Sequence, residues 1–143
     1  MHYYQLPAPL KPLADKFYRS QRSAMRAKAD GQTWVAADRA IVAALCLHKV
    51  EHGHWLTSLL VATTQRKQGV ARQLIEAALA DCSTPVWLFC EPQLNDFYLR
   101  LGFIPCTDLP QVLAERLARY RRSKSLQAFS RHPAHAVRGD ACP

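Results

Sequence analysis

The stretch Leu59-Leu60-Val61-Ala62-Thr63-Thr64-Gln65-Arg66-Lys67-Gln68-Gly69-Val70-Ala71-Arg72 decides the fold of this chain. Its apolar half runs into a polar loop, and the loop leads into a helix that begins near Gly69. A helix N-terminus leaves several amide N–H groups unpaired and carries a partial positive charge. Small residues let a ligand approach this backbone, and basic side chains surround it. The turn is therefore predicted to bind an anion such as a phosphate group.

The segments on either side of this turn predict a sheet. Residues 33–37 and 40–50 are rich in β-branched and aromatic residues, and with 54–62 they are predicted to form an antiparallel meander of three strands. Residues 2–6 are read as a short first strand that ends at Pro7. After an amphipathic helix over 70–82, the compact apolar segment Val86 to Cys90 is typical of a buried parallel strand. Strand, helix and strand in this order make a right-handed crossover, so 54–62 and 86–90 are expected to pair in parallel. A short helix over 94–101 stops at Gly102, and 103–106 is expected to be an edge strand.

The two ends of the chain are predicted to add helices. Apolar positions at helical spacing predict one bent helix or two short ones between residues 10 and 29, stopped by Asp30-Gly31. Residues 110–128 are predicted to form an extra amphipathic helix that packs against the domain or a second subunit, and its apolar stripe is Val112, Leu113, Leu117 and Tyr120. We expect a single domain over 1–130 and a poorly ordered tail over 131–143.

Composition narrows the class of protein. With 49% hydrophobic and 21% charged residues among 143, the chain is expected to build one packed core. The five cysteines are odd in number and widely spaced and form no CxxC pair, which argues against a disulfide framework and against a thiolate zinc site. Residues 1–7 lack the features of a secretory signal, and no apolar run is long enough to cross a bilayer. We therefore expect a cytoplasmic protein without a membrane partner.

Positive charge is concentrated at the two flanks. Residues 1–30 hold six Lys and Arg against two acids, residues 31–110 six against seven, and residues 111–143 seven against two. Basic flanks attract nucleic acid, acidic proteins or the phosphates of a cofactor. No basic cluster is interleaved with stacking aromatics, so a solvated helix face ranks ahead of a nucleic-acid site.

The hexapeptide Arg66-Lys67-Gln68-Gly69-Val70-Ala71 resembles the pyrophosphate-binding signature of the GNAT superfamily of N-acetyltransferases: Arg or Gln, two residues, Gly, one residue, then Gly or Ala. The resemblance implies acetyl-coenzyme A as cofactor and the GNAT fold, a mixed α/β (α+β), mostly antiparallel central sheet with a splayed parallel strand pair, flanked by helices. It also implies a bulge in the preceding strand, which frees backbone groups for the pantetheine arm. The implied cofactor-binding residues are Leu59, Leu60, Val61, Arg66, Lys67, Gln68, Gly69, Val70, Ala71 and Arg72.

The segment Asn95-Asp96-Phe97-Tyr98-Leu99-Arg100-Leu101-Gly102-Phe103 resembles a second block of the same superfamily, a short helix that ends as Phe-Tyr, two or three residues, Gly-Phe. Together the two motifs extend the resemblance over about half of the chain, from Gln32 to Cys106. When an amine attacks the thioester, a nearby phenol can donate a hydrogen bond or a proton to the leaving sulfur, so Tyr98 is the predicted general acid. Asn95 is expected either to hydrogen-bond the cofactor or to occupy a surface position.

The general base is left open by the sequence. Many relatives use a carboxylate on the strand before the phosphate loop, or a water bound there, and this strand has no carboxylate in the present chain. Glu91 is the nearest candidate, followed by His54 and His48, and a water-mediated route is equally compatible. No metal site is expected, because His52 and His54 flank a turn and no sequence partner completes a ligand set.

Three functions are compatible with these patterns. The first is transfer of an acetyl group from acetyl-coenzyme A to the amine of a small molecule, an amino acid or a protein. The second is a non-catalytic acyl-coenzyme A sensor or partner-binding module that lacks a working base. The third is acetylation of aminoacyl-tRNA, suggested by the basic flanks. A homodimer is compatible with each of them.

Overall fold

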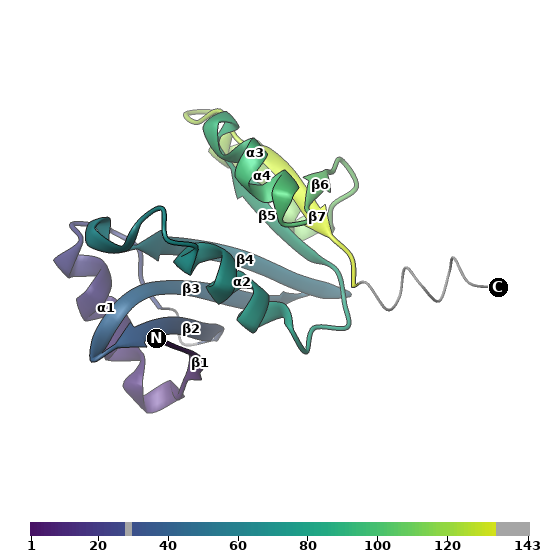
Figure 1. The fold of residues 1–143 in the computed structure, drawn as a ribbon. Coiled ribbons are helices and arrows are strands. Elements are labelled where there is room, and N and C mark those ends of the chain that lie inside the picture. Colours follow the sequence, from purple (N-terminus) through teal and green to yellow (C-terminus); the bar gives the residue numbers. More distant parts are fainter. Residues whose placement is uncertain (28–29, 134–143) are drawn as a thin grey trace. The chain divides into compact units, whose positions relative to one another are not determined.

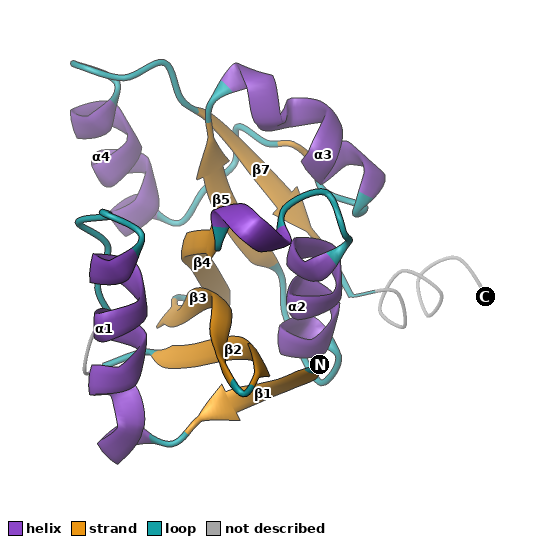
Figure 2. Cartoon of the chain, turned by 60° about the vertical axis from the view of Figure 1, so that its left-hand side comes forward, coloured by secondary structure: helices purple, strands orange, loops and turns teal. Residues whose placement is uncertain are grey.

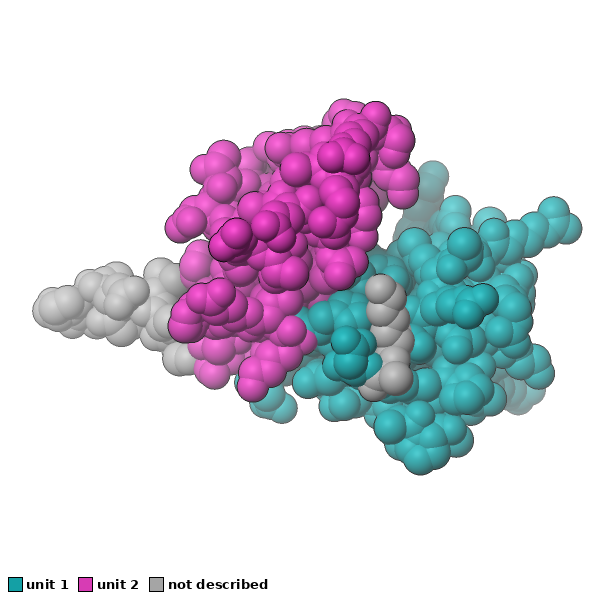
Figure 3. Space-filling view, turned by 180° about the vertical axis from the view of Figure 1, so that it is seen from behind, with its two compact units in different colours: residues 1–48, 56–81 teal, residues 49–55, 82–143 magenta. Residues whose placement is uncertain are grey.

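A computed structural model of the chain describes residues 1–27 and 30–133. These residues form two compact units, shown in Figure 3. Among the described residues, unit 1 comprises 1–27, 30–48 and 56–81, and unit 2 comprises 49–55 and 82–133. Strand β4 contributes its first residues to unit 2 and the rest to unit 1.

The described residues form seven strands and four α-helices (Figure 1). The strands are β1 (His2–Leu6), β2 (Gln32–Asp38), β3 (Ala40–Val50), β4 (Gly53–Val61), β5 (Val86–Cys90), β6 (Ile104–Pro105) and β7 (Gln127–Arg131). The helices are α1 (Lys11–Ser20), α2 (Val70–Leu79), α3 (Asn95–Arg100) and α4 (Gln111–Tyr120). The hydrogen-bonded strand order is β1-β2-β3-β4-β5-β7-β6. Among the described helices, none combines the length and apolar character that a membrane crossing requires.

In unit 1, the antiparallel strands β1, β2 and β3 lie between α1 and α2 (Figure 2). The tight turn between β2 and β3 is made at Arg39, whose φ is 72°. The core of this unit joins the buried face of α1 to apolar side chains of the strands, and its buried members are Leu6, Ala14, Phe17, Tyr18, Val35, Ala44 and Ala62. Burial of these side chains is the main stabilising contribution to unit 1.

Helix α1 is shorter than the sequence predicted. It ends at Ser20 because Arg22 adopts a φ of 59°, and the amide of Ser23 then bonds back to the carbonyl of Tyr18 at 3.0 Å. The chain beyond this end is pinned by the amide of Ala27, which donates to Asp15 Oδ1 at 2.7 Å. The predicted helical continuation from Ala24 is therefore wrong as far as Ala27, and residues 28–29 lie outside the described part.

Unit 2 is built around β5. The first residues of β4 run parallel to it, with His54 opposite Val86 and Trp55 opposite Trp87. On its other side β7 pairs antiparallel, from Val86 with Arg131 to Cys90 with Gln127. Helices α3 and α4 lie on opposite sides of β5 and β7 (Figure 2). The mixed, mostly antiparallel sheet with one parallel pair is confirmed, as is the edge position of the strand within 103–106.

The C-terminal part of unit 2 corrects the prediction of one helix over 110–128. Helix α4 ends at Tyr120, and residues 127–131 form β7 between β5 and β6. Strand pairing overrides helix propensity here, because it buries Phe129 completely between two partners. Leu113 and Leu117 are buried as predicted, whereas Val112 is exposed. The predicted tail lies outside the described residues from position 134 onward.

Candidate active site

The turn before α2 has the backbone geometry of an anion site. Gly69 is the N-cap of α2 and adopts a left-handed conformation, with φ 80° and ψ 8°. The first backbone hydrogen bond of α2 runs from the amide of Gln73 to the carbonyl of Gly69, at 3.0 Å, and no side chain caps the N-terminus of the helix. The amides of the first turn, at Val70, Ala71 and Arg72, are thus left to an outside acceptor. A Cβ placed on Gly69 would meet no atom within 4 Å, so the approach to these amides is open.

Side chains around this turn supply positive charge. Arg66, Lys67, Gln68 and Arg72 are all exposed, and the first turn of α2 contains no acidic residue. Arg66 is held in place, because its Nε donates to the carbonyl of Val61 at 3.2 Å. Lys67 adopts a φ of 64°, which turns the loop toward the helix start. Exposed cations next to a helix N-terminus favour an anionic ligand.

Strand β4 has an irregularity just before this turn. Ser58 adopts a φ of 58° within the strand, and its carbonyl accepts a 2.7 Å hydrogen bond from the hydroxyl of Tyr18 on α1. Such a positive φ interrupts the regular ladder as a bulge does. Leu59, Leu60 and Val61 follow it and are half-buried. This is the place where the family resemblance implied a bulge.

Tyr98 on α3 is buried among aromatic rings of unit 2. Its ring packs edge-on against Phe97 at 5.0 Å and against Phe103 at 5.8 Å between centroids. Within the described residues its hydroxyl has no hydrogen-bond partner. Burial, with a smaller contribution from Cys90, raises the pKa of Tyr98 well above its usual range. The phenol therefore keeps its proton at neutral pH and is available as a donor.

Asn95, the first residue of α3, uses its side-chain amide within unit 2. Its Oδ1 accepts from the thiol of Cys90 at 3.5 Å, and its Nδ2 donates to Gln127 Oε1 at 3.2 Å. Burial raises the pKa of the Cys90 thiol to about 11, so the thiol stays protonated and able to donate. Asn95 thus ties the start of α3 to β5 and β7, which positions the helix that carries Tyr98.

The candidate bases differ in their surroundings. Glu91 is exposed, and its Oε2 accepts from Gln93 at 2.9 Å. His54 Nδ1 lies 3.2 Å from Thr84 Oγ1, and burial, followed by the charge of Lys49, lowers the pKa of His54. His48 Nε2 lies 3.0 Å from the hydroxyl of Thr57. Glu91 and His54 belong to unit 2, with Tyr98, whereas His48 belongs to unit 1, with the turn at Gly69.

Two features were missed by sequence reasoning. One is Tyr18, because the apolar stripe predicted for the first helix was Leu10, Leu13, Ala14 and Phe17. Leu10 and Leu13 are exposed, and the buried face is Ala14, Phe17 and Tyr18. The spacing of these three residues, i, i+3 and i+4, was the available signal. The other is Arg116, whose guanidinium carbon lies over the ring of Trp55, 5.0 Å from its centroid. No sequence signal pairs these two residues, because they are distant along the chain.

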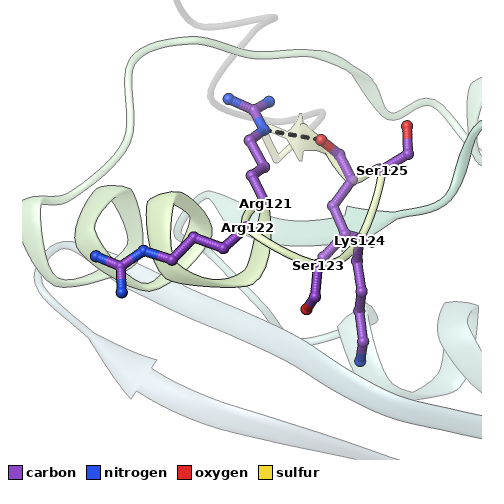
Figure 4. Close-up of a pocket in the computed structure, with 6 residues that line it drawn as sticks. Arg121, Arg122, Ser123, Lys124 and Ser125 are labelled. Atoms are coloured by element: carbon purple, nitrogen blue, oxygen red, sulfur yellow. Dashed lines mark hydrogen bonds between the residues drawn. The ribbon is translucent and has the colours of Figure 1, made fainter.

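A basic surface hollow lies between α4 and β7 in unit 2. It has a volume of about 490 Å³ and is lined by Arg121, Arg122, Ser123, Lys124, Ser125 and Leu126. Arg121 Nε donates to the carbonyl of Leu126 at 2.9 Å. Figure 4 shows the side chains of Arg121, Arg122 and Lys124 pointing in different directions. They do not converge on one anion, which agrees with a solvated basic surface.

Comparison with known proteins gives a consistent family and fold. Residues 29–105, more than half of the chain, match the model of an acetyltransferase (GNAT) domain. No curated protein matches the sequence closely enough to count as a relative.

Similar solved structures include an acyl-CoA N-acyltransferase from Pseudomonas aeruginosa, 18% identical with a TM-score of 0.62, where the match covers 91% of this chain and 98% of that one. Another is an aminoglycoside 6'-N-acetyltransferase complexed with coenzyme A, 11% identical with a TM-score of 0.65, over 92% and 96% of the two chains. A third is the N-acetylglutamate synthase of Neisseria gonorrhoeae, complexed with coenzyme A and N-acetyl-glutamate, 12% identical with a TM-score of 0.65, over 91% of this chain and 34% of that one.

Proposed function

Because the chain belongs to the GNAT acetyltransferase family, we propose that it transfers an acetyl group from acetyl-coenzyme A to a primary amine. The observation that carries this proposal is the open turn at Gly69. There a left-handed glycine, uncapped helix amides and exposed basic side chains face an unobstructed approach. Two similar structures contain coenzyme A, which supports the same cofactor for this chain.

The residues of the turn fit the pyrophosphate of coenzyme A. The amides of Val70, Ala71 and Arg72 would donate to its oxygens, and Arg66, Lys67 and Gln68 would surround it. Gly69 is needed because a side chain there would fill the space through which the phosphates approach. Backbone groups of Leu59, Leu60 and Val61, which follow the irregularity at Ser58, would hydrogen-bond the pantetheine arm. When bound, acetyl-coenzyme A supplies the acetyl group as an activated thioester.

We assign the proton transfers to residues of unit 2. With acetyl-coenzyme A bound, Tyr98 would donate a hydrogen bond or a proton to the sulfur as the carbon–sulfur bond breaks, and its raised pKa keeps the phenol protonated until then. The amine loses one proton as the nitrogen–carbon bond forms. Glu91, whose second carboxylate oxygen has no partner among the described residues, accepts this proton directly or through water. Asn95 holds α3 and so positions Tyr98, in addition to any contact with the cofactor.

A screen for thiol release tests the proposed function. The purified protein is mixed with acetyl-coenzyme A and a panel of amines, amino acids and peptides, and free thiol is measured with a chromogenic disulfide. At least one acceptor should release thiol in proportion to its concentration. Binding of acetyl-coenzyme A, detected as a rise in melting temperature, without thiol release from any acceptor would support the non-catalytic sensor. Absence of both would refute the cofactor assignment.

A further inference from the structure

Four side chains of unit 2 form a cation–aromatic cluster on the α4 side of β5, which we call the Arg116 cluster: Arg116, Trp55, Phe89 and Tyr120. The rings of Trp55 and Phe89 lie 5.5 Å apart, and those of Phe89 and Tyr120 lie 6.3 Å apart. The guanidinium of Arg116 lies over Trp55 at 5.0 Å, and its Nη1 donates to the hydroxyl of Tyr120 at 3.4 Å. The cluster joins β4, β5 and α4.

Among the described residues, the guanidinium of Arg116 has no acidic counterpart. It carries five N–H groups, and the bond to Tyr120 uses one of them. No carboxylate in residues 1–27 and 30–133 lies within ion-pair distance of it. The neighbouring Glu115 instead contacts Gln111 at 3.3 Å. A half-buried guanidinium held on an aromatic ring, with its remaining donors unused, matches the bidentate geometry of a carboxylate.

The position of the Arg116 cluster relative to Tyr98 is compatible with binding of the acceptor amine by the cluster. Successive residues of a strand point to opposite faces, and on β5 Phe89 contacts Tyr120 of α4 while Cys90 bonds Asn95 of α3. Tyr98 lies on α3, so the Arg116 cluster and Tyr98 occupy opposite faces of the same strand. In acyl transfer the amine attacks the carbonyl carbon while the sulfur leaves in another direction. A residue that donates to the sulfur and a residue that binds the acceptor amine are therefore expected on different faces of β5.

We propose that Arg116 binds the carboxylate of the acceptor, and that the acceptor is a small amine bearing a carboxylate and an apolar side chain, such as an apolar amino acid. The rings of Phe89 and Tyr120 contact the apolar side chain, and the guanidinium fixes the carboxylate. This inference rests on the proposed acetyl transfer and narrows it to one substrate class. Arg116 is a specificity residue in this arrangement, because it touches the acceptor outside the reacting atoms.

Paired acceptors test the assignment by kinetics. Phenylalanine, methionine and leucine are each compared with their carboxamides, at saturating acetyl-coenzyme A, in the wild type and in Arg116→Gln. The wild type should use the carboxylates with the lower KM. Arg116→Gln should raise their KM by about 10- to 100-fold, the loss expected for a charge-assisted hydrogen bond, and leave the carboxamides unchanged. Arg116→Lys should recover part of the effect, since it restores charge without the planar fork.

Two further measurements separate this inference from the proposed function. Arg119→Ala, an exposed arginine of the same helix, is the matched control and should leave the carboxylate preference intact. Calorimetric binding of the same amino acids and carboxamides to the wild type and to Arg116→Gln is measured independently of turnover. If the carboxylates bind the wild type no better than the carboxamides, or bind Arg116→Gln equally well, the inference is overturned even if acetyl transfer occurs. Loss of acetyl transfer with all acceptors would instead count against the proposed function.

Discussion

The hydroxyl of Tyr18 donates a 2.7 Å hydrogen bond to the carbonyl of Ser58, the residue at which β4 departs from regular strand geometry. Tyr18 is fully buried in the core of unit 1, so its position is fixed by packing. The bond is part-buried, and a carbonyl in such a place needs a donor because an unpaired buried oxygen is costly. The core thus stabilises the irregular backbone just before the turn at Gly69.

Removing this hydroxyl should destabilise unit 1. Tyr18→Phe keeps the ring and its packing but leaves the carbonyl of Ser58 without its donor, so the free energy of unfolding should fall by about 1–3 kcal/mol. Denaturant unfolding of the variant measures the change. Tyr4→Phe removes the hydroxyl of an exposed tyrosine of β1 and is the control. Equal stability of the two variants would show that the bond to Ser58 contributes nothing.

Charge at position 69 should separate folding from cofactor binding. Asp and Asn are favourable N-cap residues and tolerate positive φ better than other side chains, and the space around Gly69 is open. Gly69→Asp and Gly69→Asn should therefore both fold. Gly69→Asp should abolish the rise in melting temperature that acetyl-coenzyme A produces, because its carboxylate repels the pyrophosphate, and Gly69→Asn should retain part of it. Equal stabilisation of both variants would contradict the location of the pyrophosphate.

The phenol of Tyr98 is predicted to contribute to the catalytic rate and not to folding or cofactor binding. Tyr98→Phe removes an oxygen that bonds no other described residue, so folding and acetyl-coenzyme A binding should be unchanged while kcat falls by about 100-fold. Because the pKa of Tyr98 is raised, the wild-type rate should show no alkaline loss from this group near the ordinary tyrosine pKa of about 10. An unchanged kcat in the variant would show that Tyr98 contributes only to packing.

His54 should make the stability of unit 2 depend on pH. Burial, followed by Lys49, lowers its pKa in the folded state, so the unfolded chain binds the proton first as the pH falls. Stability should therefore be constant above the ordinary histidine pKa of about 6.5 and decrease below it. His54→Asn should flatten the decrease in melting temperature between about pH 7.5 and 5.5. His52→Asn, at an exposed turn residue beside Glu51, should leave the slope as it is.

Local sequence signals predicted most of the fold. The strand Val86–Cys90 matches its predicted bounds, and the helix after Gly69 starts where the glycine predicted, because hydrophobic period and turn residues act locally. The end of α1 and the strand β7 were not predicted. The first depends on a positive φ at Arg22, and the second depends on pairing with strands distant in sequence, which overrides the helical pattern that continues beyond Tyr120.

The candidate site was predicted less completely. The turn at Gly69 and the helix of Tyr98 were located because their motifs are contiguous in sequence. The hydrogen bonds of Asn95 to Cys90 and Gln127, and the position of Arg116 over Trp55, join segments that no spacing rule relates. Such contacts follow from strand order, which in this chain places β7 next to β5.

The place of β7 between β5 and β6 also orders the events of biosynthesis. All residues of unit 1 precede position 82, so this unit can fold while the ribosome still holds the rest of the chain. The apolar strand β5 is complete at Cys90, but its neighbour begins at Gln127, and at about 5–20 residues per second the interval is roughly 2–7 s. During this interval nascent β5 presents an unpaired edge to other emerging chains. The speed of translation between the codons for Cys90 and Gln127 should therefore govern the yield of soluble protein.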